Sequence, residues 1–149
     1  MKRTAAFVLL FLALGILPAS AQERWMSLAG RDHALAGQIW DVAQGTYLSE
    51  AQLIERLAAA AFVLLGETHD NPDHHRLQAR MVAGLGPSGR FGAVAFEMLD
   101  SAQAPALTRH LEREGVAEGL GRAVGWRRWP DWRQNYQPIA EAALAAGMT

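Results

Sequence analysis

Residues 61–78 constrain the fold more than any other stretch of the chain. A short apolar run, Phe62 to Leu65, ends at Gly66, and four acidic or amide side chains and three of the five histidines follow it. An apolar run that is short and ends at a glycine predicts a buried strand. Asn71 followed by Pro72 predicts a helix start, because asparagine caps helices and proline fits the first helical position. The stretch therefore predicts a strand, a polar loop and a helix, and ligands bind at such strand ends in open α/β sheets.

A second apolar run, residues 92–97, follows this helix and predicts a second buried strand. Strand, helix and strand in succession form a βαβ unit, so strands 61–65 and 92–97 should be parallel. Glu67 and Glu97 would then lie at the same edge of the sheet and belong to one site. The fold class expected is α/β, with a βαβ-containing parallel sheet flanked by helices.

The remaining elements are expected to add one short strand and several helices. Ser49 and Gln52 match a capping box and predict a helix that starts there. The other expected elements are a strand at 37–42 and helices at 105–114, 116–124 and 138–146. The alternation of strands and helices along the chain predicts a third strand at Thr149. A sheet of only two strands could not bury both of its faces against so many helices. We therefore expect residues 22–149 to be a single α/β domain that is incomplete at its C-terminal end.

The first 21 residues have the pattern of a secretory signal peptide. Lys2 and Arg3 precede an apolar stretch at 5–16 and an Ala-Ser-Ala cleavage site at 19–21. The alternative is an N-terminal membrane anchor, but the apolar stretch is short for a membrane span. The mature chain is expected to begin near Gln22 and to be periplasmic.

The composition excludes several kinds of function. The chain contains no cysteine, which excludes disulfides, a lipidated cysteine and cysteine-based zinc or haem attachment. Loss of the signal peptide changes the formal charge from −1 to −3, because 12 of the 14 basic residues remain against 15 acidic ones. A weakly acidic chain is a poor candidate for nucleic-acid binding. Arg127, Arg128 and Arg133 cluster and could contact an anion locally.

The polar loop suits metal ligation, general acid–base chemistry, or both. Glu67 and His69 point the same way on an extended segment. His74 and His75 lie in the first helical turn, where the helix N-terminus favours neutral imidazole. Asp73 in this turn is typical of a residue that caps a helix and offsets its dipole. His74 or His75 alone is more typical of a solvated helix position than of a ligand.

Two carboxylates are harder to explain without a site. Glu67 directly follows a buried strand and a glycine, and Glu97 lies between Phe96 and Met98. An unpaired buried charge is costly, so each should have a partner. We therefore interpret both as site residues, and His33 and His110 as surface or core residues.

The aromatic stretch 126–136 allows two interpretations. The helix-like spacing of Trp129, Trp132 and Tyr136 is typical of core packing. The functional interpretation is a flat apolar wall for a macrocycle or aromatic ligand. Tyrosine can also ligate haem iron directly.

Residues 64–78 resemble the motif of the ChaN-like haem-binding uptake proteins of Gram-negative bacteria, within the Tiki / erythromycin-esterase-like superfamily. The resemblance covers residues 36–147. It is supported by the similar segments 37–41, 95–98, 126–130 and 136–139.

The resemblance implies an exported α/β domain with a role in haem or iron uptake. It also implies a homodimer around paired haems and an outer-membrane haem-uptake machinery as partner. Described members include lipoproteins, whereas this chain has no cysteine to lipidate. It should therefore be a soluble periplasmic form, and it stops well short of the family's length.

The first hypothesis is a periplasmic haem-binding protein for iron acquisition. Its polar site would consist of Glu67, His69, His74, His75 and Glu97, with Tyr136 as a haem contact. The alternative is a hydrolase of the superfamily's esterase or metalloprotease type. In that case Glu67 and His69 would activate a water, with or without a divalent metal such as zinc, and Glu97 would orient the base. A third alternative is a non-catalytic remnant.

Overall fold

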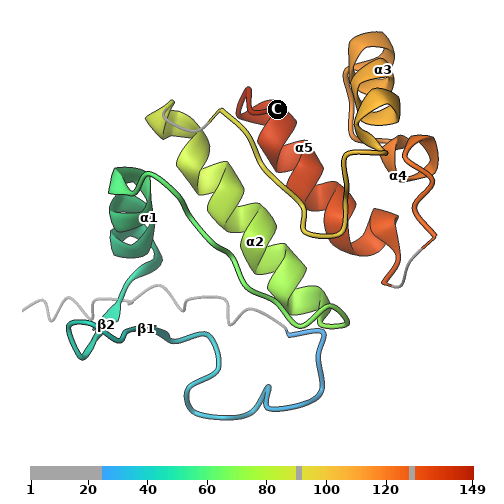
Figure 1. Ribbon diagram of the computed structural model, residues 1–149. Coiled ribbons are helices and arrows are strands. Elements are labelled where there is room, and N and C mark those ends of the chain that lie inside the picture. Colours follow the sequence, from blue (N-terminus) through green and yellow to red (C-terminus); the bar gives the residue numbers. More distant parts are fainter. Residues whose placement is uncertain (1–24, 90–91, 128–129) are drawn as a thin grey trace, which may run out of the picture.

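The computed structural model describes residues 25–89, 92–127 and 130–149, and the expected signal peptide at 1–21 lies outside them. Figure 1 shows two central helices side by side, with the hairpin at one end and further helices at the other. The elements are β1 (Ile39–Asp41), β2 (Thr46–Leu48), α1 (Glu50–Ala59), α2 (Pro72–Leu85), the 3₁₀ turn η1 (Gly86–Ser88), α3 (Ala104–Glu114), α4 (Leu120–Ala123), the π-helical turn η2 (Trp132–Tyr136) and α5 (Gln137–Ala145).

The strand expected at 37–42 is confirmed as β1, and it belongs to a hairpin that the sequence analysis missed. Strand β1 pairs antiparallel with β2. Gly45 in the connecting turn has a positive φ of 61°, a conformation that suits glycine. The capping box is also confirmed, since the Ser49 side chain accepts from the Gln52 amide and the Gln52 side chain accepts from the Ser49 amide. These contacts fix the start of α1.

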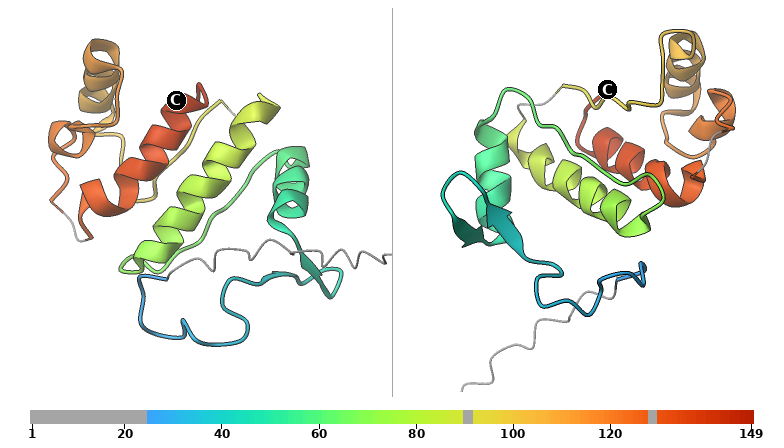
Figure 2. Two further views of the ribbon diagram at one scale, coloured as in Figure 1. Left: turned by 180° about the vertical axis from the view of Figure 1, so that it is seen from behind. Right: turned by 60° about the horizontal axis from the view of Figure 1, so that its bottom comes forward.

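Helices α2 and α5 form the centre of the core. Asn71 caps α2 and Pro72 occupies its first turn, as the sequence predicted. Two views show α2 and α5 running side by side (Figures 1 and 2). Their C-terminal ends meet closely, because a Cβ added to Gly86 would lie 2.8 Å from the Ala146 Cβ. The buried apolar side chains of this core come from both helices and from the C-terminal third of the chain: Val82, Leu85, Leu120, Val124, Trp132, Tyr136, Ile139, Ala140 and Ala143.

The expected parallel sheet does not appear in the described part of the chain. Residues 62–67 and 92–96 are extended, and a turn follows the second segment at Glu97 and Met98. No backbone hydrogen bond joins the two segments. The only sheet among the described residues is the antiparallel β1–β2 pair. A parallel ladder needs regular backbone bonds between neighbouring strands, and here a groove separates the two segments. The order of extended segment, helix and extended segment is nevertheless as predicted.

Both extended segments alternate between an inner and an outer face, as strands do. Val63 and Leu65 pack against the core, whereas Phe62 and Leu64 are 88% and 95% exposed.

The C-terminal residue Thr149 makes one strand-like contact with the second extended segment. The Thr149 amide donates to the Gly92 carbonyl, and the Thr149 carbonyl accepts from the Val94 amide. This is the pattern of a parallel bridge at the position where a third strand was expected.

The C-terminal third begins with helix α3, as expected from 105–114, and continues through the short α4. The helix expected at 116–124 is reduced to Leu120–Ala123, with Gly119 at positive φ before it. Asp131 then caps η2, whose last turn carries Tyr136 into the core. The C-terminal third therefore supplies the aromatic side chains that pack beside α2.

Candidate functional site

Glu67 is the centre of the site, and its carboxylate is contacted from three sides. It follows the first extended segment, and its side chain is only 9% exposed. Its Oε1 accepts a hydrogen bond from the Tyr136 hydroxyl at 2.7 Å and lies 2.7 Å from His69 Nδ1. Its Oε2 lies 2.8 Å from His75 Nδ1. The partner that Glu67 was expected to need is thus present, and it consists of residues from η2, the loop and α2.

These contacts set the protonation of the central groups. Burial alone would raise the pKa of Glu67, but hydrogen bonds from Tyr136 and His69 outweigh it and hold that pKa below its ordinary value. Burial, reinforced by the hydrogen bond to Glu67, raises the pKa of Tyr136 well above its ordinary value. Glu67 is therefore a carboxylate and Tyr136 a neutral phenol that donates to it.

His69 is the exposed member of the cluster, and its side chain is 51% accessible. Its Nδ1 faces Glu67, as the shared direction of positions 67 and 69 predicted. The hydrogen bond to Glu67 raises the pKa of His69, and the charges of Glu67 and Glu97 add to the effect. Its Nε2 makes no hydrogen bond within the described ranges. A histidine held by a carboxylate through one nitrogen, with the other exposed, is the usual arrangement of a metal-ligating imidazole.

The other two histidines of the motif differ from each other. His75 is 1% exposed and its Nε2 donates to the His69 carbonyl at 3.0 Å, so its interpretation as a solvated helix residue was wrong. It is buried because it lies on the face of α2 that carries Gln78, Val82 and Leu85. That helical spacing was the signal that could have revealed it. His74 is partly buried, and its Nδ1 accepts from the Thr68 amide at 2.8 Å.

A groove runs between the two extended segments and ends at this cluster. Its volume is about 820 Å³, which falls in the range of small-molecule sites. Glu67, His69, Glu97 and Tyr136 all line it. Glu97 is exposed, so the expectation that it is a buried carboxylate like Glu67 was wrong. Its floor comes from α2 and α5 and is largely apolar: Val82, Leu85 and Ile139, with Gln78 donating to the Leu65 carbonyl at 2.9 Å.

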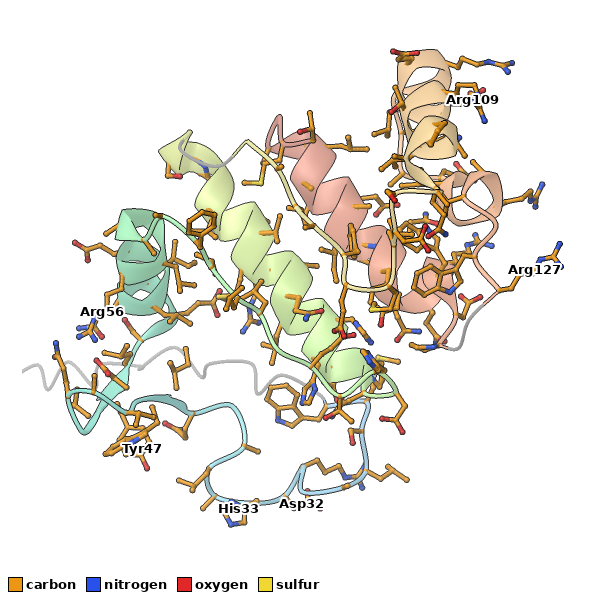
Figure 3. All side chains as sticks on the ribbon, in the orientation of Figure 1. Asp32, His33, Tyr47, Arg56, Arg109 and Arg127 are labelled. Atoms are coloured by element: carbon orange, nitrogen blue, oxygen red, sulfur yellow. The ribbon has the colours of Figure 1, made fainter. Side chains whose placement is uncertain are left out.

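The aromatic stretch packs in the core. Tyr136 lies edge-on to His75 at a centroid distance of 4.6 Å and is surrounded by Trp126, Trp132 and Phe96. Tyr136 still reaches the groove with part of its surface. Trp129 and Arg128 lie outside the described residues. Arg127, at the far side beyond α4, points away from the helices (Figure 3).

Asp73 has a role that the capping interpretation missed. Its buried carboxylate accepts from the amides of Met26 at 3.0 Å and Ser27 at 2.7 Å, and it pairs with Arg76. Asp73 thus fastens the lead-in segment to the first turn of α2. No sequence signal distinguishes this role from an ordinary first-turn aspartate, because the partners lie more than 40 positions away.

No group of three or more histidine, aspartate or glutamate side chains in the described chain has the geometry to hold a metal ion. The zinc alternative therefore gains no support here and stays a prediction. None of the helices in the described segments is long and apolar enough to span a membrane.

In this fold, two extended segments and α2 present a carboxylate–histidine cluster at the end of an apolar groove. The chain belongs to the family described as haem-binding uptake, Tiki superfamily, ChaN, whose model matches residues 53–149. The resemblance seen in the sequence is thereby confirmed. No match was found among curated proteins or among solved structures.

Proposed function

We propose that the protein binds haem at the polar end of the groove between residues 61–67 and 92–98. The observation that supports this most directly is the state of His69, whose Nδ1 is held by Glu67 while Nε2 makes no bond within the described structure. The apolar groove floor suits the porphyrin, and a neutral imidazole suits the iron. The family's name, haem-binding uptake, agrees with this proposal.

The residues present fit haem in their chemistry. His69 Nε2 is the candidate iron ligand, and Glu67 would fix its ring. Bound haem would supply an iron that a histidine nitrogen can coordinate. Glu97 lines the same groove. The Tyr136 hydroxyl donates a hydrogen bond to Glu67. His74 and His75 are engaged with Thr68 and with Glu67, so they support the site instead of facing the ligand.

Titration with ferric haem tests the proposal. We expect a Soret band that saturates at a fixed stoichiometry, and His69→Ala should weaken binding at least about tenfold and change the band position. His33→Ala is the matched control, because His33 is an exposed histidine on the lead-in loop, distant from α2 (Figure 3). Equal binding by wild type and His69→Ala would refute the role of His69, and absence of a Soret band would refute haem binding.

We further propose that residues 1–21 export the protein to the periplasm, where it would act in haem and iron uptake. The basic and apolar pattern of that segment supports export. Cell fractionation followed by N-terminal sequencing tests this, and we expect a periplasmic protein that starts near Gln22. Recovery of the uncleaved chain in the cytoplasm would contradict it. The homodimer and the outer-membrane partner implied by the family stay predictions.

A further inference from the structure

The groove has two carboxylates at its polar end and no basic side chain among the described residues that line it. The carboxylates are those of Glu67 and Glu97, and no arginine or lysine of the described ranges contributes to the lining. Arg76 and Arg80 of the neighbouring helix α2 pair with acidic side chains that lie outside the groove. A ligand in this groove therefore meets negative charge at the polar end and mainly apolar side chains along the rest.

The two carboxylates differ in how they are engaged. Glu67 is almost buried and accepts a hydrogen bond from Tyr136. Glu97 is exposed and makes no hydrogen bond or ion pair within the described ranges. The pKa of His69 is raised first by its hydrogen bond to Glu67, and the charge of Glu97 adds to that effect. Glu97 therefore lies close enough to act on the centre of the site, and its charge is available to an incoming ligand.

The charges of a haem are confined to one edge of the macrocycle. Its two propionates lie on that edge, and the other edges carry uncharged methyl and vinyl groups. A propionate beside Glu97 would be repelled, and more strongly once the macrocycle excludes water from the groove. His69 does not offset this repulsion, because an imidazole that ligates iron is neutral. An uncharged edge can occupy the same place without repulsion.

We propose that Glu97 is the specificity-determining residue of the groove. It turns the propionate edge of a porphyrin away from the polar end, so the groove accepts porphyrins with carboxylates on one edge and rejects those with carboxylates all round the ring. This inference rests on the proposed function for the porphyrin itself. It goes beyond that function by naming which porphyrins bind and how they are oriented.

A glutamate that is merely solvated makes a different prediction. Interactions between exposed charges are weak, with effects on binding of about fivefold at most. A solvated Glu97 would therefore change the affinity for every porphyrin little and to the same extent. A role in recognition makes the effect depend on where the ligand carries its carboxylates, and makes it smaller as the salt concentration rises. The ratio of two affinities therefore separates the two roles.

The test measures binding of iron-free porphyrins to the full chain by fluorescence, which removes the contribution of iron and its ligand. Protoporphyrin IX has both propionates on one edge, its dimethyl ester has no charge, and coproporphyrin I has a propionate on every ring. Wild type should bind the ester at least as tightly as protoporphyrin, and coproporphyrin at least about tenfold more weakly. Glu97→Gln should reduce the ratio of coproporphyrin to protoporphyrin dissociation constants by about threefold or more.

Glu112→Gln is the matched control, because Glu112 is exposed on α3 and does not line the groove. It should keep the wild-type ratio. Glu97 is itself exposed, so its replacement by glutamine should not unfold the chain. A wild-type ratio in Glu97→Gln, or equal binding of the two porphyrins by wild type, would overturn the inference and leave porphyrin binding intact. If none of the three porphyrins binds, the proposed function fails and the inference fails with it.

Discussion

The Tyr136 hydroxyl donates a 2.7 Å hydrogen bond to Glu67, which lies 69 positions earlier in the chain. This bond joins the π-helical turn η2 to the polar loop that follows the first extended segment. Together with the hydrogen bond from His69, it lowers the pKa of Glu67. The C-terminal aromatic stretch thus helps to keep Glu67 of the motif ionised.

Tyr136→Phe should lower the free energy of unfolding by about 1.5–3 kcal/mol, the usual range for a hydrogen bond to a charged group. The ring would still fill its place among Trp126, Trp132 and Phe96, so packing should change little. Urea unfolding measures the loss. Tyr47→Phe is the matched control, since Tyr47 is exposed on the hairpin (Figure 3), and it should be neutral. Equal effects in both variants would show that the Glu67 contact contributes nothing.

The pH dependence of stability follows from the lowered pKa of Glu67. Its ordinary value is 4.5, and the folded state lies below it, so Glu67 adds stability above pH 4.5 that is lost as the pH falls through the folded pKa. The stability gap between wild type and Tyr136→Phe should therefore shrink as the pH falls below 4.5. A series of urea unfolding curves in acid measures this gap. A gap that stays constant across the series would contradict the assignment of the lowered pKa to the Tyr136 bond.

Gly121→Ala should destabilise the fold by about 1–3 kcal/mol, as overpacking does in a tight core. A Cβ at position 121 would overlap the Trp132 ring, which is itself buried. Gly66→Ala is a fitting comparison, because no atom lies within 4 Å of a Cβ added there. Thermal unfolding of both variants decides the matter, and we expect only Gly121→Ala to melt earlier. Unchanged melting of Gly121→Ala would mean that α4 and η2 pack differently.

Asp73→Ala should release the lead-in segment from α2. The carboxylate of Asp73 holds the amides of Met26 and Ser27, and alanine offers no acceptor. Limited trypsin digestion should then cut after Arg31 faster than in wild type, because a freed segment is a better substrate. Asp70→Ala, at a neighbouring exposed position, should leave the cutting rate unchanged. Equal rates in wild type and Asp73→Ala would contradict the fastening role.

Local signals in the sequence located most elements well. The Ser49 capping box and the Asn71-Pro72 start are short-range features, so α1 and α2 begin where the sequence predicts. The hairpin partner β2 was missed because its three residues form no periodic pattern that could be recognised. The parallel ladder did not appear because pairing depends on a distant segment, and a groove lies between 61–67 and 92–98.

The candidate site was predicted only in part, because some of its contacts are local and others join distant segments. Glu67 and His69 are two positions apart, so their bond follows from local geometry. The burial of His75 could have been found from its spacing with Gln78 and Val82 on one face of α2. Its close contact with Glu67, and the hydrogen bond from Tyr136, could not have been found, because each depends on where α2 and η2 pack.

The sequence by itself determined the strand-end motif of residues 61–78 and its family. Apolar runs, helix caps and residue spacing are encoded within a few neighbouring positions, and these sufficed. Only the tertiary structure decided what the motif becomes. Packing of α2 against η2 and α5 brings His75 and Tyr136 to different oxygens of Glu67 and leaves His69 as the motif histidine that lines the groove. That division arises because burial and hydrogen-bond partners are set by contacts between distant segments, which no local pattern records.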